Sequence, residues 1–189
     1  MNIGVLSLQG DFLEHIQILQ RLGIKAKEVK LPKDLENIGG IILPGGESTT
    51  IASLLDVFNL REPLKQKIKN GLPAWGTCAG MILLAKKLLQ DKPIPLGLIN
   101  ITVNRNAFGR QIESFEVPLE IKPLGSRPLI AAFIRAPSIS EIGDGIETLA
   151  TLKDSTIVAA RQKNILVTSF HTELTTNTRL HEYFLSHII

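Results

Sequence analysis

The sequence lacks several features that would place a protein in a specialised class. It has one cysteine among 189 residues, so no disulfide can form within the chain, and such sparse use of cysteine is typical of a reducing compartment. No apolar run approaches the roughly 20 residues that span a bilayer, and the first five residues contain no basic segment of a secretory signal. We therefore expect a soluble cytoplasmic protein with no membrane contact.

The chain also has little excess of charge of either sign. The formal net charge is +3, acidic and basic residues are interspersed, and no run of Lys or Arg forms a basic patch, so we expect no nucleic-acid partner. Hydrophobic residues make up 44% and charged residues 21%, an ordinary globular mixture. With no internal repeat, low-complexity segment or linker, the chain is expected to form one domain over residues 1–189.

The most informative stretch runs from Leu72 to Ala85 and predicts a short strand followed by an apolar helix. Residues 76–80 at the junction are Gly-Thr-Cys-Ala-Gly, the pattern G-x-C-x-G. In a sharp strand-to-helix turn the central residue has a strained backbone and neighbouring segments approach closely, so small residues suit the flanking positions. The helix dipole favours a thiolate there. We interpret Cys78 as a nucleophile, and the alternative is a buried, inert cysteine.

The first half of the chain alternates strands and helices. Apolar runs predict buried strands at 3–8, 26–31 and 40–43, and helical spacing predicts helices at 12–22, 48–58, 62–70 and from the Cys78 turn to residue 89. We expect Asp11 to cap the first helix and Ser48 or Thr49 to cap the second. This rhythm indicates a three-layer, doubly wound α/β fold with a mostly parallel sheet.

After Pro95 the pattern changes to short runs separated by turn residues. These runs predict antiparallel strands that extend the sheet, at 98–103, 114–121, 129–134, 148–152, 156–161 and 165–169. Asn164 indicates a hairpin turn, and a final amphipathic helix is expected from about Asn177.

The third strand ends in Pro44-Gly45-Gly46, followed by Glu47 and Ser48. Glycines free the backbone to expose N–H groups, and such a loop before a helix is where anions bind. The loop lacks the G-K-[ST] ending, so it is not a nucleotide P-loop. On these residues alone, an anion site and an ordinary capped loop are both open.

A cysteine nucleophile needs a base, and the chain has four histidines. His181 and His187 fall on the final helix as solvated or packing residues, and His15 on the first helix is expected to be structural or at an interface. His171 lies where a strand leaves the sheet, with Glu173 two residues on. Residues i and i+2 of an extended chain point the same way, so Glu173 can hold the second imidazole nitrogen.

An acyl oxyanion also needs hydrogen-bond donors. The N–H of Ala79, directly after Cys78, is one candidate. Gly46 is well suited to supply the other, because glycine lets a backbone N–H come close.

Together these motifs resemble class I, triad-type glutamine amidotransferases, and within them the glutaminase subunits of pyridoxal 5′-phosphate synthase. The similarity covers the whole chain. It is carried by GVL at 4–6, LQG at 8–10, LPGGESTT at 43–50, GTCAG at 76–80, RN and FGRQ at 105–106 and 108–111, FIRAP at 133–137, and SFH at 169–171. GTCAG marks only the superfamily, whereas LPGGESTT, RNxFGRQ and FIRAP are specific to the subunit. Thr172 stands where the family usually has proline, and Ala107 where serine is usual.

The resemblance implies a flavodoxin-like amidotransferase fold and a division of labour. Cys78 would attack the side-chain amide of L-glutamine, His171 would protonate the leaving ammonia, and Glu173 would orient His171. It further implies that the residues lining the glutamine site are Gly46, Glu47, Ser48, Arg105, Ile134 and Arg135. Ammonia would pass through a tunnel to the synthase subunit, and the reaction would need no cofactor and no metal.

Three rival interpretations remain at this point. The first is the glutaminase subunit of another amidotransferase, such as imidazole glycerol phosphate synthase. The second is a cysteine peptidase or hydrolase on a similar fold. The third is a catalytically inactive binding module, which the presence of Cys78, His171 and Glu173 disfavours.

Overall fold

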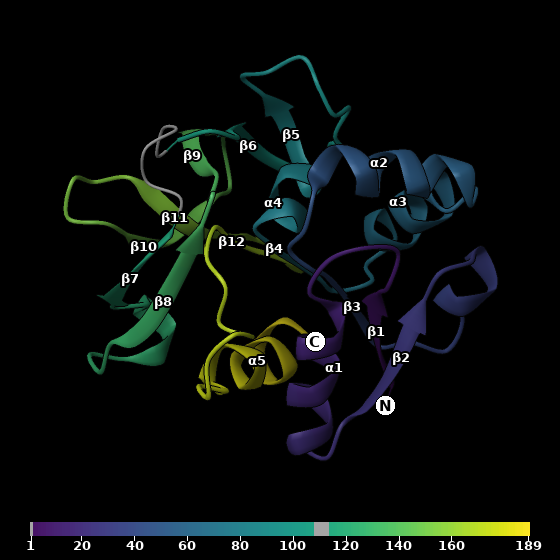
Figure 1. Cartoon of the computed structure of the whole chain (residues 1–189), viewed down its shortest axis with the longest axis horizontal. Helices are drawn as coiled ribbons and strands as arrows, with labels where there is room; N and C mark the ends of the chain where they lie inside the picture. Colours follow the sequence, from purple (N-terminus) through teal and green to yellow (C-terminus); the bar gives the residue numbers. More distant parts are fainter. Residues whose placement is uncertain (1, 108–113) are drawn as a thin grey trace.

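The computed structural model describes residues 2–107 and 114–189 (Figure 1). Phe108, Gly109, Arg110 and Gln111 of the RNxFGRQ motif therefore lie outside the described residues. The described part forms a ten-stranded sheet in the order β2-β1-β3-β4-β12-β11-β9-β6-β5, with β10 paired to β11. None of its helices is long and apolar enough to cross a membrane.

The parallel half of this sheet confirms the strands predicted from the first apolar runs. Strands β2, β1, β3, β4 and β12 are parallel neighbours, which places their carboxyl ends along one edge. Nearly every residue of β1, β3, β4 and β12 is buried, as expected for a sheet covered on both faces. Their bounds are Lys25–Val29 (β2), Asn2–Leu6 (β1), Gly40–Leu43 (β3), Ala74–Thr77 (β4) and Ile165–Thr168 (β12).

Helices cover both faces of the sheet and make three layers (Figure 1). One hydrophobic core joins the sheet to α1 and the C-terminal helices, with Leu19 and Phe184 as members, and the other joins it to α2, α3 and α4, with Leu55 and Leu64. The helices are α1 (Phe12–Arg21), α2 (Ser48–Val57), α3 (Arg61–Lys69), α4 (Ala79–Leu84), α5 (Arg179–Tyr183) and the π-helical turn η3 (Phe184–Ile188), with short 3-10 turns η1 (Pro32–Leu35) and η2 (Lys122–Leu124).

The predicted helix through residue 89 is wrong, because α4 ends at Leu84 and the chain continues as β5 (Ala85–Leu88). The cause is competition for carbonyl groups. The N–H groups of Leu96 and Leu98 donate to the carbonyls of Leu83 and Leu84, which another helical turn would have used. A run that is apolar all round does not distinguish a buried helix from a buried strand.

The second half of the sheet confirms the expected antiparallel additions in part. Strand β11 (Ile157–Gln162) forms the predicted hairpin with β12, and β10 (Glu147–Thr151) pairs with its other edge. Strand β9 (Ser138–Ile142), which sequence reasoning missed, joins β11 to β6 (Ile99–Asn104). Its serines and glutamate hid the strand pattern.

Strands β7 (Ser114–Leu119) and β8 (Leu129–Ile134) do not extend the main sheet as predicted, but pair with each other in a separate two-stranded sheet. Phe115 and Phe133 stack across this pair, with ring centroids 4.7 Å apart, and Phe133 also contacts Phe170. The small sheet therefore packs its aromatic face on the core rather than joining the ladder. It reaches the loop after β12, because the N–H of His171 donates to the carbonyl of Ala132 at 2.8 Å.

Candidate active site

The turn between β4 and α4 has the strained geometry that the G-x-C-x-G pattern predicts. Cys78 has φ 46° and ψ −102°, a conformation that is costly for a residue with a side chain. Its N–H donates to the carbonyl of Thr168 at 2.8 Å, which ties the turn to β12. The side chain is 7% exposed, at the carboxyl edge of the parallel strands.

The two glycines of the motif allow close approach of neighbouring backbone. A Cβ on Gly80 would lie 2.0 Å from the carbonyl oxygen of Leu43, at the end of β3. A Cβ on Gly76 would lie 2.5 Å from the carbonyl carbon of Gly80. Neither position admits a side chain without displacing backbone, which is the reason the pattern needs glycine at both.

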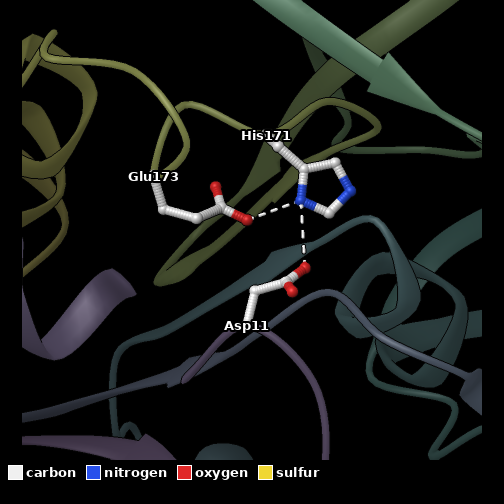
Figure 2. Close-up of side chains that lie close together, drawn as sticks. All are labelled: Asp11, His171 and Glu173. Atoms are coloured by element: carbon white, nitrogen blue, oxygen red, sulfur yellow. Dashed lines mark hydrogen bonds and ion pairs between the residues drawn. The ribbon is translucent and has the colours of Figure 1, made fainter. Parts of the chain in front are cut away.

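His171 and Glu173 lie side by side after β12, as the i, i+2 spacing predicts. Nδ1 of His171 is 2.6 Å from Oε1 of Glu173, and Figure 2 shows the carboxylate pointing at that nitrogen. Both residues are buried, at 3% and 4% exposure. A buried carboxylate must be paired, and the imidazole is its hydrogen-bond donor.

Cys78 and His171 also meet, although 93 residues separate them in the sequence, because β4 and β12 are neighbours in the sheet. Burial lowers the pKa of His171, but side-chain hydrogen bonds to Cys78 and Glu173, together with the negative charges of both, raise it to about 11. The imidazole is therefore protonated at neutral pH and lies between a sulfur and a carboxylate.

Asp11 also lies beside the imidazole of His171, in addition to Cys78 and Glu173. Sequence reasoning did not predict this contact. Asp11 occupies the N-cap position of α1, as predicted, but its side chain accepts no capping hydrogen bond. Its Oδ2 lies 3.5 Å from Nδ1 of His171 (Figure 2), while its N–H donates to the carbonyl of Gly45 at 3.1 Å. Its position just beyond the carboxyl end of β1 is the signal that could have found it.

Asp11, His171 and Glu173 also qualify by proximity as metal ligands, since one ligand atom of each lies within 4.8 Å of the others. Metal bonds of about 2.0–2.2 Å from one ion would hold an imidazole nitrogen and a carboxylate oxygen at roughly 3 Å or more. The 2.6 Å between His171 and Glu173 is shorter, and is that of a direct hydrogen bond. The arrangement is therefore a hydrogen-bonded pair with a nearby second carboxylate.

The glycine loop after β3 closes over the imidazole. A Cβ on Gly45 would lie 2.3 Å from Cε1 of His171, so only glycine fits beside the ring. Gly46 has φ 147°, and the N–H of the next residue, Glu47, donates to the side-chain oxygen of Gln9 at 2.8 Å. Gln9 was part of a recognised motif, but its contact with this loop was not predicted.

The helix after this loop is capped by Glu47, so the prediction of Ser48 or Thr49 as its cap is wrong. The Glu47 carboxylate accepts from the N–H groups of Thr49 and Thr50, at 3.1 and 2.6 Å. Partial burial would raise the pKa of Glu47, but these N–H groups outweigh it and lower the pKa. Ser48 is instead buried, at 4% exposure.

Two backbone N–H groups at the site have no backbone partner among the described residues. Across residues 2–107 and 114–189, neither Gly46 nor Ala79 donates to a backbone carbonyl. Gly46 follows β3 and Ala79 follows β4, and these strands are adjacent and parallel. The two amides that sequence reasoning selected as oxyanion donors therefore belong to neighbouring turns.

Arg105 and Glu47 lie together on the rim of the site. The guanidinium is 3.6 Å from Oε1 of Glu47 and donates to Oγ1 of Thr49 at 3.3 Å and to the carbonyl of Lys92. Its Nε is buried and has no partner among the described residues. The Arg105 guanidinium is thus held in one orientation, and its Nε–H is a donor with no partner among the described residues.

Ile134 is the last residue of β8, and Arg135 follows it. They follow Ala132, the residue that bridges to His171, by two and three positions. Arg135 has φ 44°, and both side chains are exposed. The small sheet therefore brings the FIRAP motif close to the loop that carries the imidazole.

Comparison with known proteins decides the family to which these features belong. The model of the SNO glutamine amidotransferase family matches residues 5–189. The chain belongs to this family. The match extends over nearly the whole chain, as the sequence motifs had indicated.

Relatives within the family are closely similar over their whole length. A protein of Moorella thermoacetica named pyridoxal 5′-phosphate synthase subunit PdxT is 54% identical, covering 100% of both chains. A protein of the same name from Herpetosiphon aurantiacus is 53% identical, covering 98% of this chain and 99% of its own.

Solved structures agree with this assignment. A glutamine amidotransferase crystal structure matches with a TM-score of 0.90 and 47% identity, covering 97% of this chain and 96% of the other. The structure of PurLQS from Thermotoga maritima matches with a TM-score of 0.71 at 15% identity, over 100% of this chain and 98% of that one, and shows a shared fold only.

Proposed function

We propose that this member of the SNO family is the glutaminase subunit of pyridoxal 5′-phosphate synthase. It would hydrolyse L-glutamine to L-glutamate and ammonia, and the ammonia would be used by a synthase subunit in vitamin B6 biosynthesis. Support comes from relatives more than 50% identical over nearly the whole chain that bear this subunit's name. The observation that carries the chemistry is the pairing of His171 with both Cys78 and Glu173.

The proposed reaction begins with attack of the Cys78 sulfur on the side-chain amide carbon of glutamine. The tetrahedral oxyanion would lie between the N–H groups of Gly46 and Ala79, neither of which has a backbone acceptor among the described residues. The protonated imidazole of His171 then gives its proton to the departing ammonia. Glu173 holds the imidazole at its other nitrogen during this transfer.

The second half of the reaction releases glutamate. Water, deprotonated by the now neutral His171, attacks the glutamyl thioester, and the Cys78 sulfur leaves as the thiolate. This returns the sulfur and the imidazole to their starting protonation states. The step requires Cys78 to be reduced, which supports placing the reaction in the cytoplasm, and Cys78 is a free cysteine.

Glutamine would be held by residues on the rim of the site. Arg105 has a buried, unpartnered Nε and is fixed by Thr49 and Glu47, so it can bind the substrate α-carboxylate with donors already oriented. The other proposed contacts are Gly46, Glu47, Ser48, Ile134 and Arg135. Glu47 is ionised and therefore suits the α-ammonium of the substrate.

The deciding experiment measures ammonia released from glutamine by the purified chain, alone and with the synthase subunit. We expect low release alone and higher release in the complex, because apo sites of this kind are often incompletely organised. A complex that forms but releases no ammonia above the rate of the Cys78→Ala variant would exclude the proposal. Glutamine-dependent formation of pyridoxal 5′-phosphate separates it from a glutaminase that serves another synthase.

A further inference from the structure

A second imidazole lies beside the triad carboxylate. His15, on α1, has no exposed surface, and its Nε2 is 3.6 Å from Oε1 of Glu173 and 3.3 Å from Oγ1 of Thr77. Thr77 immediately precedes Cys78. His15 therefore adjoins both the carboxylate that holds His171 and the strand end that carries the nucleophile.

The other ring nitrogen of His15 is occupied as well. Its Nδ1 is 2.9 Å from Nε2 of His181, which α5 holds fully buried. Trp75 packs edge-on against both rings, with centroid distances of 5.5 Å to His15 and 4.7 Å to His181. Contacts from β4, α5 and the loop after β12 thus fix the orientation of the His15 ring.

Both of these imidazoles are neutral at physiological pH. Burial first, and then the charge of the protonated His171, hold the pKa of His15 well below its ordinary value. Burial and the charge of Arg21 lower the pKa of His181 to about 3. A neutral imidazole has one N–H and one bare nitrogen, so the neighbours of each ring decide where its hydrogen lies.

The neighbours assign both hydrogens. Nε2 of His15 faces the hydroxyl of Thr77 at 3.3 Å, which can accept or donate, and the carboxylate of Glu173 at 3.6 Å, which only accepts, so a hydrogen on Nε2 suits both neighbours. Its bare Nδ1 then accepts from the Nε2–H of His181. This leaves Nδ1 of His181 bare, in agreement with its lack of any hydrogen-bond partner in the described part of the chain. The reverse arrangement would direct a lone pair of His15 at the carboxylate.

We propose that His15 is a positioning residue: its Nε2–H, which Thr77 holds in place, points its positive end at the Glu173 carboxylate 3.6 Å away and keeps that carboxylate against His171 by electrostatic attraction. Glu173 has a side chain with no exposed surface, and its Oε2 has no partner among the described residues, so few groups restrain it. A neutral donor suits this place, because a second cation would compete with His171 for the carboxylate. This proposal rests on the proposed function, in which Glu173 holds the imidazole of His171 during proton transfer.

The test compares His15→Phe and His15→Gln in the complex with the synthase subunit, measuring ammonia release from glutamine. Phenylalanine fills the space without a donor, so we expect kcat to fall about tenfold with KM changed by less than about twofold. Glutamine keeps an N–H donor and should restore part of kcat. His187→Phe, at an exposed histidine of η3, is the control and should match the wild type.

A second measurement does not depend on glutamine hydrolysis. Nitrogen-15 NMR of the wild-type chain should show His15 as the neutral Nε2–H tautomer, and the pKa of His171 should be lower in His15→Phe than in the wild type. The proposal is overturned if wild-type His15 carries its hydrogen on Nδ1, or if His15→Phe keeps both the kcat and the His171 titration. If His15→Phe does not fold, the wild-type tautomer and the Gln variant decide. A wild-type complex that releases no ammonia would instead defeat the proposed function.

Discussion

Cys78, His171 and Glu173 are 7%, 3% and 4% exposed, whereas Glu47 and Arg135 are exposed and Arg105 is half-buried. We call the first three residues the catalytic side of the site and the last three the glutamine side. Backbone bonds restrain the catalytic side: the N–H of Cys78 donates to Thr168, and that of His171 to Ala132. On the glutamine side, backbone groups of Thr49, Thr50 and Lys92 also bond the side chains of Glu47 and Arg105, but these two side chains reach solvent and lie 3.6 Å from each other.

This difference indicates which side is organised before the substrate arrives. Buried side chains keep their geometry in the free chain, whereas side chains that solvent reaches can rearrange. Substitutions on the catalytic side should therefore lower kcat, and those on the glutamine side should mainly raise KM.

The largest effect is expected from Cys78→Ala, which removes the sulfur and keeps the Cβ and the backbone conformation of the turn. Ammonia release should fall by about 10⁴-fold or more, since no other group in the proposal can form the thioester. The fold and binding to the synthase subunit should persist, as circular dichroism and co-purification would show. Release at the wild-type rate would remove Cys78 from the catalytic side.

Glu173→Gln should have the next largest effect, lowering kcat by about 10²–10⁴-fold with little change in KM. The amide keeps the size of the carboxylate but loses the charge that favours the imidazolium. Steady-state kinetics of the complex would measure both constants. A rise in KM with kcat preserved would show that Glu173 belongs functionally with the glutamine side.

The same variant tests the electrostatics of His171 through stability. The pKa of His171 is about 11 in the fold against 6.5 for the free side chain, so its protonated form stabilises the folded state. This contribution is fully present below about pH 6.5 and is lost as the pH rises toward 11. The difference in unfolding free energy between wild type and Glu173→Gln should therefore shrink over that range in urea titrations. A difference that grew with pH would contradict the assignment.

On the glutamine side, Arg105→Gln should raise KM for glutamine about tenfold and change kcat less, because one oriented charged donor is lost from the substrate. Arg127→Gln, at an exposed arginine before β8, is the control and should leave KM unchanged. A loss confined to kcat would place Arg105 on the catalytic side instead.

Asp11→Asn should have the smallest effect, lowering kcat/KM by up to about fivefold. Its carboxylate is 3.5 Å from His171 and its side chain is 37% exposed, so solvent screens the attraction. The effect should weaken further at high salt. An effect as large as that of Glu173→Gln would mean that the two carboxylates share one role.

The sequence was most informative about features that depend on residues close together in the chain. The alternation of apolar runs and glycines predicted β1, β3 and β4 and the helices between them, because a buried parallel strand and an amphipathic helix each have a local pattern. Strand β9 and the small sheet depend on pairing with distant segments. Polar residues such as Ser138 hide that pairing, and residues 79–85 are too uniformly apolar to show where helix gives way to strand.

The candidate site shows the same difference between local features, which the sequence predicted, and contacts between distant segments, which it did not. Motif spacing placed Cys78 in a strained turn and Glu173 beside His171, since both features lie within a few residues. It could not place Asp11 or His15, because their contacts with residues 171 and 173 are made across most of the chain. Capping shows the same limit: Asp11 stands at the N-cap of α1 as predicted, but its side chain faces the imidazole, and Glu47 rather than Ser48 caps α2.

The contact between Gly80 and the carbonyl of Leu43 has a consequence for redesign of the enzyme. It locks the turn that contains Ala79 to the strand that ends before Gly46, so the two amides keep one spacing. A methyl group at residue 80 would act as a wedge and open that spacing, even though it touches neither sulfur nor substrate. Libraries intended to change which amide is cleaved should therefore leave this junction constant and vary the outer residues.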